Sequence, residues 1–576
     1  MTYNPLTIGW ANGATSVVSS RFAYGLSLPQ PYEEAEYTLL KGTATNSTHW
    51  TLTAKCSGCT SYIGNDGSLT VLNGTGTAYF AWAQGGSSVQ EPANNQSAFN
   101  IHNQYGKWTH NLNAARSSKF ADWVAANRLE DAPTTTSSPV TTVPATATET
   151  TSTKTTLETS PAPSATNGAI PASCSASAPK YPYKLATGWK ATKVLGGLRT
   201  PRAVISDTLG SLLIVESGKG ISVHTISADG CTGATKMLIS QTNLNHGIQL
   251  SPDGKTLYAS SMTQVYQWTY DAASQSVQGS STIIVKGMYN GGHPTRTLVL
   301  APHQPNLLVI SLGSNANWDY DSGNPNTGRA LIRAFDLNAI PSGGYDYITG
   351  GYLMGYGLRN EIALTFDGNN MLWGSENSGD EFQRTPLGQN TQIDVHSDNP
   401  AEKLNFIGDV TKPNNNWYGY PTCFTVWEPS LFTDTKFSVG DQFVVSPNAT
   451  FNDATCREKV TLPAMGYQAH SAPIDHKFDS TYSNLFVSFH GSWNRPTPTG
   501  YKLVAVPFTK GSDGAYKPVA PLNSNTGYQD IMWNPDLTVC TTACFRPAGL
   551  MFDKVGRLYM TSDAPGEGEL WVLGQS

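Results

Sequence analysis

The chain has 576 residues, of which 39% are hydrophobic, 10% aromatic and only 14% charged, and it contains 54 glycines and 35 prolines. Frequent turns and few charges argue against coiled coils and helical bundles, which depend on long charged helices. The 36 basic and 42 acidic residues give a net charge of −6, so no general basic field is available to hold nucleic acid. No apolar run approaches the ~18 residues of a membrane-spanning helix. We therefore expect neither nucleic acid nor a membrane as a partner.

The cysteines and glycosylation sequons indicate a secreted protein. Asn-X-Ser/Thr sequons begin at Asn46, Asn73, Asn95 and Asn448. Met1 is not followed by a signal peptide, and we expect that this segment was lost with the N-terminus. Many connectivities are open to eight cysteines, so the pairing of near neighbours is a hypothesis. The pairs are Cys56 with Cys59, Cys174 with Cys231, Cys423 with Cys456, and Cys540 with Cys544.

A segment rich in threonine, serine and proline divides the chain. From Pro133 to Thr166, 24 of 34 residues are of these three types and none is aromatic, so the segment cannot bury enough apolar surface to offset its ordering entropy. We interpret residues 131–173 as a linker between an N-terminal domain, 1–130, and a C-terminal domain, 174–576. A long ordered loop inside one domain is the alternative, although such loops are rare in compact domains.

The C-terminal domain contains six segments that read as strand, turn and strand, most of them with Asp or Gly in the turn. With six units in residues 174–576, each unit has about 67 residues, enough for a four-stranded blade and its loops. The sequence therefore predicts a six-bladed β-propeller, and an all-β protein as a whole. A stack of independent hairpins is the alternative. The six segments are 203–215, 248–260, 297–309, 362–374, 472–488 and 548–560.

Residues just before each innermost strand of a propeller face the central channel, where ligands bind. Four of the six units carry an arginine there, and converging guanidinium groups repel one another unless a planar anion lies among them. We therefore expect a ligand with carboxylates or phosphates. A lone arginine is also a common surface residue, and His246 and Trp493 are equally explained by packing. The candidate channel residues are Arg202, His246, His293, Arg296, Arg359, Asn360, His470 and Arg546, with His490, Trp493 and Arg495 from the loop after the fifth hairpin.

Two oxygen-rich segments follow the fourth hairpin. Residues 375–381 and 416–421 supply carboxylate, amide and carbonyl oxygens, the ligands that a hard cation such as calcium prefers. Their spacing does not match an EF-hand. An ordinary acidic turn is the alternative reading of this composition.

Several C-terminal motifs together resemble the soluble pyrroloquinoline quinone (PQQ)-dependent glucose and sugar dehydrogenases, most closely the fungal PQQ-dependent pyranose dehydrogenases. The resemblance covers most of residues 180–575 and implies a planar tricarboxylate cofactor, PQQ, held by calcium and arginines. The motifs are His293-Pro-Thr-Arg-Thr-Leu-Val-Leu-Ala-Pro, Gly357-Leu-Arg-Asn, Ser375-Glu, Tyr418-Gly-Tyr-Pro and Phe545-Arg.

Carried over residue by residue, the resemblance implies that His293 is the general base and that Arg359 stabilises charge on the quinone carbonyl. The main-chain carbonyls of Ser378 and Gly379 fall where the family binds calcium. Arg495 stands, in a differently built loop, where the bacterial enzymes have a lysine, so their sugar preference is not assumed. We assign the cofactor site to Arg202, His246, Arg296, Arg359, Asn360, His490, Trp493, Arg495 and Arg546.

The N-terminal domain resembles the cytochrome domain of fungal cellobiose dehydrogenases. The resemblance implies a β-sandwich that holds heme b between a methionine and a histidine, and Met1 and His102 fall on these positions. The strands that the family has before the methionine are absent, so we expect a truncated sandwich with exposed edges. The matching motifs are Trp10-Ala-Asn-Gly, Asn46-Ser-Thr-His-Trp, Cys56-Ser-Gly-Cys, Ala81-Trp and Ser97-Ala-Phe-Asn-Ile-His.

These observations lead to one hypothesis and two alternatives. The hypothesis is a secreted, monomeric oxidoreductase that oxidises the C1 hydroxyl of pyranose sugars with PQQ. Electrons then pass through heme b to an external acceptor, such as a copper polysaccharide monooxygenase. A carbohydrate-binding propeller without PQQ would instead repeat exposed aromatics in each blade. A propeller that hydrolyses lactones or esters would place carboxylates and asparagines where this chain has arginine and histidine.

Overall fold

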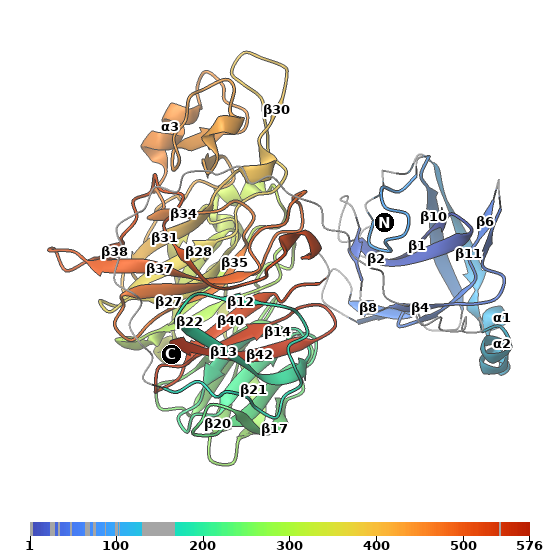
Figure 1. Cartoon of the computed structure of the whole chain (residues 1–576), viewed down its shortest axis with the longest axis horizontal. Helices are drawn as coiled ribbons and strands as arrows, with labels where there is room; N and C mark the ends of the chain where they lie inside the picture. The colour runs from blue at the N-terminus through green and yellow to red at the C-terminus, as the bar shows by residue number, and fades with distance from the viewer. Residues whose placement is uncertain are drawn as a thin grey trace, which may run out of the picture. The chain divides into compact units, whose positions relative to one another are not determined.

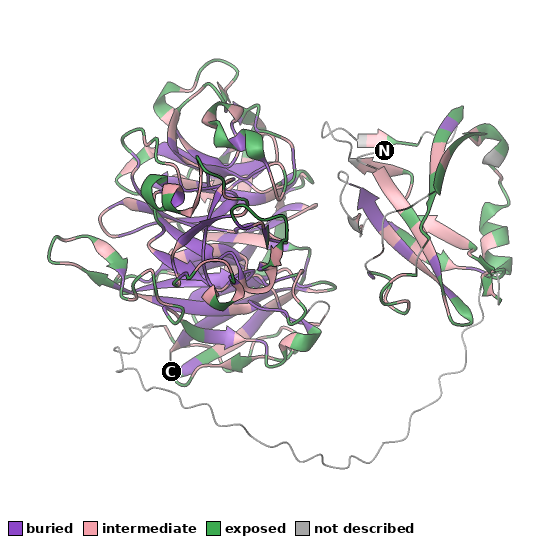
Figure 2. Ribbon diagram, turned by 90° about the horizontal axis from the view of Figure 1, so that it is seen from above, coloured by how far each residue is buried: buried purple, intermediate pink, exposed green. Residues whose placement is uncertain are grey.

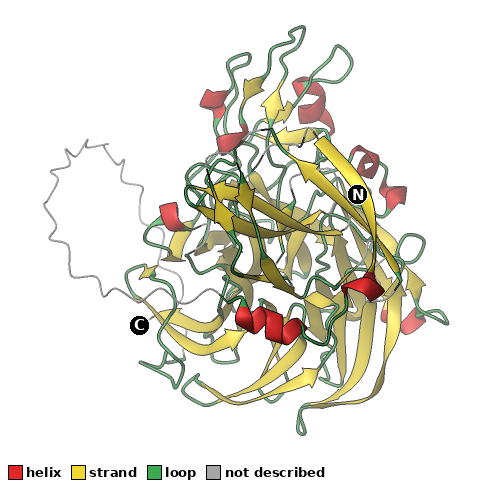
Figure 3. Cartoon of the chain, turned by 90° about the vertical axis from the view of Figure 1, so that its right-hand side faces the viewer, coloured by secondary structure: helices red, strands yellow, loops and turns green. Residues whose placement is uncertain are grey.

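The computed structural model divides the chain into two compact units, Met1–Glu158 and Thr159–Ser576 (Figure 1). It describes residues 4–23, 29–32, 35–46, 49–63, 69–72, 76–86, 88–97, 99, 102, 104–128, 168–540 and 543–575. Strands make up most of the regular structure, and the described helices are short (Figure 3). The predicted all-β class is therefore confirmed. Most of the predicted linker lies outside the described residues, so its bounds stay a prediction.

Six sheets, each built on four antiparallel strands, form the blades of a β-propeller in the second unit. Each innermost strand lies beside the next, and the first lies beside the last, so the six close into a ring. The predicted six-bladed propeller is confirmed. The innermost strands are β14 (Pro201–Ser206), β18 (Leu244–Leu250), β22 (Leu298–Ala301), β27 (Glu361–Phe366), β35 (Pro473–Phe478) and β40 (Pro547–Phe552).

The other three strands extend each blade outward from the channel. The second strands are β15 (Leu212–Glu216), β19 (Thr256–Ser261), β23 (Gln304–Leu312), β28 (Met371–Glu376), β36 (Asn484–Phe489) and β41 (Leu558–Ser562). The third strands are β16 (Gly220–Ile226), β20 (Val265–Asp271), β24 (Leu331–Asp336), β31 (Glu402–Asp409), β37 (Lys502–Lys510) and β42 (Gly568–Gln575). The outermost strands are β17 (Thr232–Ile239), β21 (Ser276–Lys286), β26 (Tyr352–Tyr356), β34 (Met465–Tyr467), β39 (Gln529–Trp533) and β13 (Trp189–Leu198).

The last blade is completed from the beginning of the unit. Strand β13 precedes the first blade in sequence, yet it pairs antiparallel with β42, with Trp189 opposite Gln575. This pairing fastens the two ends of the ring by main-chain hydrogen bonds. The short strand β12 (Lys184–Leu185) pairs in the same way with β39 of the fifth blade.

Aspartates cap the turns of several inner hairpins and explain the repeated Asp/Gly pattern. The Asp367 carboxylate accepts hydrogen bonds from the main-chain N–H groups of Asn369 (2.8 Å) and Met371 (3.0 Å). One short side chain thus accepts from two main-chain N–H groups that would have no partner in the turn. Asp207, Asp479 and Asp553 accept the equivalent bonds from residues two and four positions ahead.

The core of the propeller lies between adjacent blades. Every residue of β15, β36 and β41 is buried, because each blade packs a neighbour on both faces (Figure 2). Buried strands of this kind read as continuous apolar runs, such as Leu212–Val215, rather than as alternating patterns.

An insertion around the fourth blade carries β29 (Gln383–Arg384), β30 (Ile393–Asp394), β32 (Cys423–Thr425), β33 (Gln442–Val444) and helix α3 (Asp453–Lys459). The buried Arg384 holds it together through Asp434 at 2.9 Å and Asp453 at 2.7 Å. The Cys423–Cys456 disulfide joins β32 to α3.

The first unit is β-rich with a small core. Strand β1 (Asn4–Asn12) pairs with β2 (Thr15–Ala23), and β10 (Thr77–Gln84) pairs with β11 (Gln104–Asn111). Trp10 and Phe22 are buried, whereas Tyr79 and Tyr105 are 84% and 74% exposed. Large aromatic side chains therefore lie open to solvent on β10 and β11. Short strands and helices complete the unit: β3 (Gln30–Pro31), β4 (Glu36–Leu39), β5 (Ala44–Thr45), β6 (Trp50–Thr51), β7 (Ala54–Ser57), β8 (Ser61–Ile63), β9 (Leu69–Val71), α1 (Leu112–Ala115) and α2 (Phe120–Ala126).

All four predicted cysteine pairs are disulfides, which confirms the pairing of near neighbours. Within the described ranges, no helix has the length and apolar character that crossing a membrane requires.

Candidate active site in the propeller channel

The predicted channel residues gather where the six innermost strands begin. His470 and Ala472, just before β35, both have left-handed backbone conformations, with φ of 63° and 54°. Such conformations are costly for residues other than glycine and persist where the surrounding structure holds them. Four of the channel residues stand just before an innermost strand, namely Arg296, Arg359, His470 and Arg546, whereas Arg202 and His246 are the second and third residues of β14 and β18.

His293 presents an unprotonated ring nitrogen. Its Nδ1 lies 2.8 Å from the main-chain oxygen of Ser314, and a carbonyl oxygen only accepts, so Nδ1 carries the proton and Nε2 the lone pair. No described residue forms a hydrogen bond with Nε2. Burial and the nearby Arg359 lower the pKa of His293 to about 3. The imidazole is therefore neutral at neutral pH and able to accept a proton.

Glycine at position 313 allows His293 to approach Asn360. A Cβ atom at Gly313 would lie 2.7 Å both from Asn360 Oδ1 and from the Cβ of His293. Any larger residue would push these two side chains apart, which explains the absence of a side chain here.

Arg359 is held through all three nitrogens of its guanidinium group. Nε donates to the carbonyl of Asn317 (3.3 Å), and Nη1 donates to the carbonyls of Asn377 (3.2 Å) and Ser378 (2.5 Å). Nη2 donates to Asn317 Oδ1 (2.9 Å) and to Asp380 (3.1 Å). This network leaves the guanidinium group a single orientation.

Asp380 connects Arg359 with two further polar side chains. Its carboxylate lies 3.3 Å from His470 Nδ1 and accepts a hydrogen bond from Asn494 (3.1 Å). Burial opposes protonation of His470, but Asp380 outweighs it and raises the pKa of this histidine. We call Arg359, Asp380, His470 and Asn494, together with His293, the Asp380 cluster.

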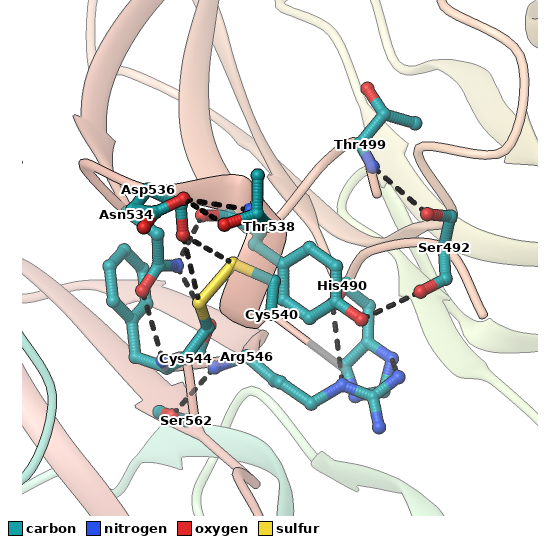
Figure 4. The surroundings of a disulfide bond; sticks show 12 residues. His490, Ser492, Thr499, Asn534, Asp536, Thr538, Cys540, Cys544, Arg546 and Ser562 are labelled. Atoms are coloured by element: carbon teal, nitrogen blue, oxygen red, sulfur yellow. Dashed lines mark hydrogen bonds between the residues drawn. A yellow bond between two sulfur atoms is a disulfide. The ribbon is translucent and has the colours of Figure 1, made fainter. Parts of the chain in front are cut away.

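A second cluster is built around Asp563, which follows β41. Its carboxylate accepts hydrogen bonds from Arg202 Nη1 (2.5 Å) and His490 Nε2 (2.6 Å). Arg546 Nη2 donates in turn to His490 Nδ1 (2.9 Å), as Figure 4 shows beside the Cys540–Cys544 disulfide. We call Arg202, His490, Arg546 and Asp563 the Asp563 cluster. Asp380 and Asp563 therefore offset part of the positive charge of these arginines. The expectation that an external anion must offset all of that charge was only partly correct.

The two clusters are joined through the main chain. His490 N donates to Ala472 O (2.9 Å), and Gly491 N donates to Ser471 O (3.1 Å). Glu402 accepts from the N–H groups of Ala472 (3.2 Å) and Ser378 (2.5 Å), and burial raises its pKa to about 7. The segments that carry both clusters therefore share one hydrogen-bonded framework.

A buried ionic group lies directly behind Arg359 and Asn360. Glu376 pairs with Lys403 at 2.7 Å and accepts from the main-chain N–H of Arg359. Asn405 donates to Glu361 (2.9 Å) and also approaches Glu376 (3.4 Å). Burial and the adjacent Glu376 raise the pKa of Glu361 well above its usual value. Glu376 is therefore the carboxylate paired with Lys403, and the protonated form of Glu361 is favoured beside it.

Arg296 differs from the other channel arginines. It is completely buried, and all its hydrogen bonds run to main-chain carbonyls, those of Met262, Tyr289, His293 and Thr295. This geometry suits a residue that holds the segment carrying His293, and the assignment of Arg296 to the cofactor site stays a prediction.

The remaining predicted residues lie at the edges of the clusters. Trp493 is 63% exposed, and Arg495 pairs with Asp398 at 2.7 Å. His246 is buried, and its Nδ1 has no hydrogen-bond partner among the described residues; the same holds for Asn494 Oδ1 and Arg495 Nε. Unpaired buried polar atoms at this end of the channel are consistent with a polar ligand.

The metal assignments stay predictions. Ser378 O already accepts from Arg359, and a Cβ at Gly379 would meet the Phe382 ring at 2.4 Å. The described residues contain no group of three or more His, Cys, Asp or Glu side chains that could hold a metal ion. The predicted calcium ligands, the main-chain oxygens of Ser378 and Gly379, are not side chains of this kind. His102 is exposed and lies 5.7 Å from the Tyr105 ring, and Met1 lies outside the described residues, so heme ligation is not tested.

The sequence patterns do not identify the two acidic residues that organise the site, Asp380 and Asp563. Asp380 is within the segment that was read as a calcium loop, and Asp563 was not singled out. A signal existed for Asp563, which lies in the last hairpin directly after the Thr561-Ser562 end of β41, close to the channel position of Arg546.

Comparison with known proteins defines the class of this molecule. The family model described as TrAA12-like matches residues 183–576, which is the propeller. The model for the cytochrome domain of cellobiose dehydrogenase matches residues 1–122. The chain therefore belongs to the TrAA12-like family and carries a cytochrome-type domain ahead of the family's propeller.

Its relatives make the family assignment more specific. A pyrroloquinoline quinone-dependent pyranose dehydrogenase from Coprinopsis cinerea is 36% identical over 576 residues, which cover 98% of this chain and 77% of the relative. A pyrroloquinoline quinone-dependent sugar dehydrogenase from Hypocrea jecorina is 38% identical over 411 residues, which cover 69% of this chain and 90% of the relative.

Solved structures agree with these relatives. The holo form of the PQQ domain of pyranose dehydrogenase from C. cinerea has a TM-score of 0.68 at 38% identity, covering 70% of this chain and 100% of that one. A calcium structure of the family AA12 protein from Trichoderma reesei has a TM-score of 0.64 at 38% identity, covering 69% and 98%.

Proposed function

We propose that this protein oxidises the C1 hydroxyl of a pyranose sugar with PQQ as cofactor. Similarity to a pyrroloquinoline quinone-dependent pyranose dehydrogenase over 98% of this chain and 77% of the relative supports the substrate class and the cofactor. The observation that carries the chemistry is the neutral His293, whose Nε2 lone pair lies in the channel near a fixed guanidinium group. A base and a cationic site for a developing negative charge are what removal of hydride and proton from an alcohol requires.

The residues present fit such a cofactor. PQQ, when bound, supplies the hydride acceptor. Arg202 and Arg546 keep guanidinium donors that no described residue uses, and guanidinium groups bind carboxylates in two-pronged fashion. His246 offers an unpaired buried nitrogen in the same region. The Asp563 cluster would therefore hold carboxylates, and Arg359 would act at the reacting end.

His293 would take the proton of the anomeric hydroxyl at Nε2. Ser314 fixes the ring through Nδ1–H, so the base cannot switch to the other tautomer without losing a hydrogen bond. Arg296 supports the same segment by donating to the carbonyl of His293. Calcium at the carbonyls of Ser378 and Gly379 would require Arg359 to share or release Ser378 O.

The first unit would carry electrons onward. Its match to a cytochrome domain supports heme b as the relay, with His102 and Met1 as proposed ligands. An external acceptor, such as a copper polysaccharide monooxygenase, would complete the path. Four disulfides support a secreted protein, because such bonds persist in oxidising surroundings.

A cofactor titration tests this function. The full chain is titrated with PQQ, with and without calcium, while the quinone absorbance is followed, and a panel of aldoses is then added. Binding followed by bleaching with a sugar would support the proposal. Absence of binding under both conditions would reject it and favour a carbohydrate-binding or hydrolytic propeller.

Replacement of the base provides the second test. His293→Ala should retain PQQ but lose sugar oxidation by about 10²-fold or more, the usual contribution of a general base. His303→Ala is the matched control, because His303 is exposed in the turn between β22 and β23. Near-normal turnover in His293→Ala would contradict the assignment.

A further inference from the structure

Asp563 links three blades through one carboxylate. It follows β41 in the sixth blade, and its main-chain N–H donates to Arg546 O (3.1 Å). Oδ2 accepts from Arg202 of the first blade (2.5 Å), and Oδ1 accepts from His490, which follows β36 of the fifth blade (2.6 Å). The Asp563 and Arg202 side chains are only 5% and 13% exposed. The carboxylate is thus the shared anchor of the cluster.

The hydrogen bonds of His490 fix its proton. A guanidinium group only donates, so the 2.9 Å contact of Arg546 with Nδ1 makes Nδ1 an acceptor. Nε2 must then carry the hydrogen that Asp563 accepts. Burial and Arg546 lower the pKa of His490 to about 4, while His490 and Arg202 outweigh burial and keep the pKa of Asp563 below its usual range. At neutral pH the cluster therefore contains a carboxylate and an uncharged imidazole.

Further charged or titratable groups face this cluster. Arg202 approaches His490 Nε2 at 3.4 Å, and the Tyr501 ring lies 5.7 Å from the Arg546 guanidinium carbon. Burial, Arg202 and Lys477 lower the pKa of the nearby His246 well below its usual value. With Arg202 and Arg546 both charged, Asp563 ionised and His490 neutral, the four cluster residues carry one net positive charge.

Asp563 anchors both guanidinium groups without using all their donors. Arg202 is engaged through Nη1, and Arg546 through Nε and Nη2. Other nitrogens of both groups have no partner among the described residues. A ligand carboxylate can therefore meet guanidinium groups whose direction is already set, which reduces the entropy cost of binding.

We propose that Asp563 is a positioning residue that orients Arg202 directly, and Arg546 through the Nε2–H tautomer of His490, for a carboxylate-bearing ligand. The inference rests on the proposed function, in which that ligand is PQQ. It extends that function by assigning the Asp563–His490 pair to the support of the ligand's anionic groups.

The direction in which Asp563→Asn changes PQQ affinity distinguishes a positioning role from simple charge balance. Asp563→Asn removes a negative charge close to two arginines, and Coulomb's law alone predicts tighter binding of an anion. Loss of orientation predicts weaker binding. We expect the dissociation constant of PQQ, from absorbance titration of the full chain, to rise at least tenfold, and to do so at both low and high ionic strength.

A matched variant controls for lost stability. Asp553→Asn removes the turn aspartate of the same blade, which bonds Arg557 and main-chain N–H groups instead of channel residues. It should lower the melting temperature and leave PQQ affinity within about twofold. Unchanged or tighter PQQ binding in Asp563→Asn would overturn the inference while leaving the proposed function intact. If the wild-type chain fails to bind PQQ, the proposed function itself fails.

The tautomer gives a readout that needs neither cofactor nor activity. In a chain labelled with ¹⁵N-histidine, the His490 signals, assigned by their loss in His490→Gln, should report the Nε2–H form at pH 7. A doubly protonated or Nδ1–H ring would overturn the inference. This measurement can overturn the inference even if Asp563→Asn does not fold, because the signals are recorded on the wild-type chain.

Discussion

The two sides of the propeller channel hold their arginines in different ways. Arg359 donates from all three guanidinium nitrogens to the protein, whereas Arg202 and Arg546 are each tied only in part. The first arrangement fixes one charge beside the base His293. The second leaves donors open. The comparison suggests that one side of the channel is organised for a reaction and the other for holding an anion.

The largest effects are expected when Arg359 and Arg546, one from each side of the channel, are replaced by lysine. Lysine keeps the charge but loses the planar set of donors. We expect Arg359→Lys to lower turnover by roughly 10²-fold, on the order of losing one stabilising donor, with a smaller change in PQQ affinity. Arg546→Lys should mainly weaken PQQ binding. Stopped-flow reduction and absorbance titration measure the two effects, and identical losses in both variants would break the comparison.

The buried ion pair behind Arg359 should be critical for stability. Lys403→Met leaves Glu376 buried without its cation, which costs about 3–5 kcal/mol for such a pair. Glu361→Gln is the control, because burial and Glu376 raise the pKa of Glu361 and an amide keeps the shape of its protonated form. Denaturant unfolding should show a large loss for Lys403→Met and a small one for Glu361→Gln. Equal losses would show that both glutamates are ionised.

Acidification should destabilise the propeller. His224, His293 and His490 have pKa values lowered by burial to about 4, 3 and 4, below the ~6.5 of an unfolded histidine. The unfolded chain takes up these protons first, so stability present above pH ~6.5 is lost as pH falls towards these values. Glu402, with its raised pKa, opposes this trend. Melting temperature should still fall from pH 7 to pH 5, and a rise would contradict the three histidine assignments.

The smallest effect is expected at Trp493. Its side chain is 63% exposed, so Trp493→Ala should change the unfolding free energy by no more than about 0.5 kcal/mol. PQQ titration of the same variant then decides its role. A tenfold loss of affinity would place Trp493 at the ligand, and an unchanged affinity would place it outside the site.

The sequence predicted the parts of this molecule that repeat. Five of the six inner hairpins have an aspartate or glycine in the turn between apolar strands, and the six hairpins together define a ring. The position near the start of each innermost strand then identified Arg202, Arg359 and Arg546. Local patterns cannot, however, reveal partners such as Asp563, which is 361 residues from Arg202. Among 42 acidic residues, only the ring geometry shows which ones meet an arginine.

Arg296 shows that the position of a residue before an innermost strand does not by itself predict its role. It occupies the same register as the other channel arginines, but its hydrogen bonds go to three main-chain carbonyls of the bend that carries His293 and to that of Met262, in the turn after β19. The bend has no counterpart in the other blades, so the direction of its carbonyls cannot be inferred from sequence.

The pairing of β13 with β42 makes the propeller suitable for circular permutation. Because Trp189 lies opposite Gln575, the two ends of the ring, β13 and β42, are neighbours in the sixth blade. A short connection between these ends and a new opening in an exposed turn should preserve all six blades. The six blades should therefore form the same channel whichever blade comes first in the chain.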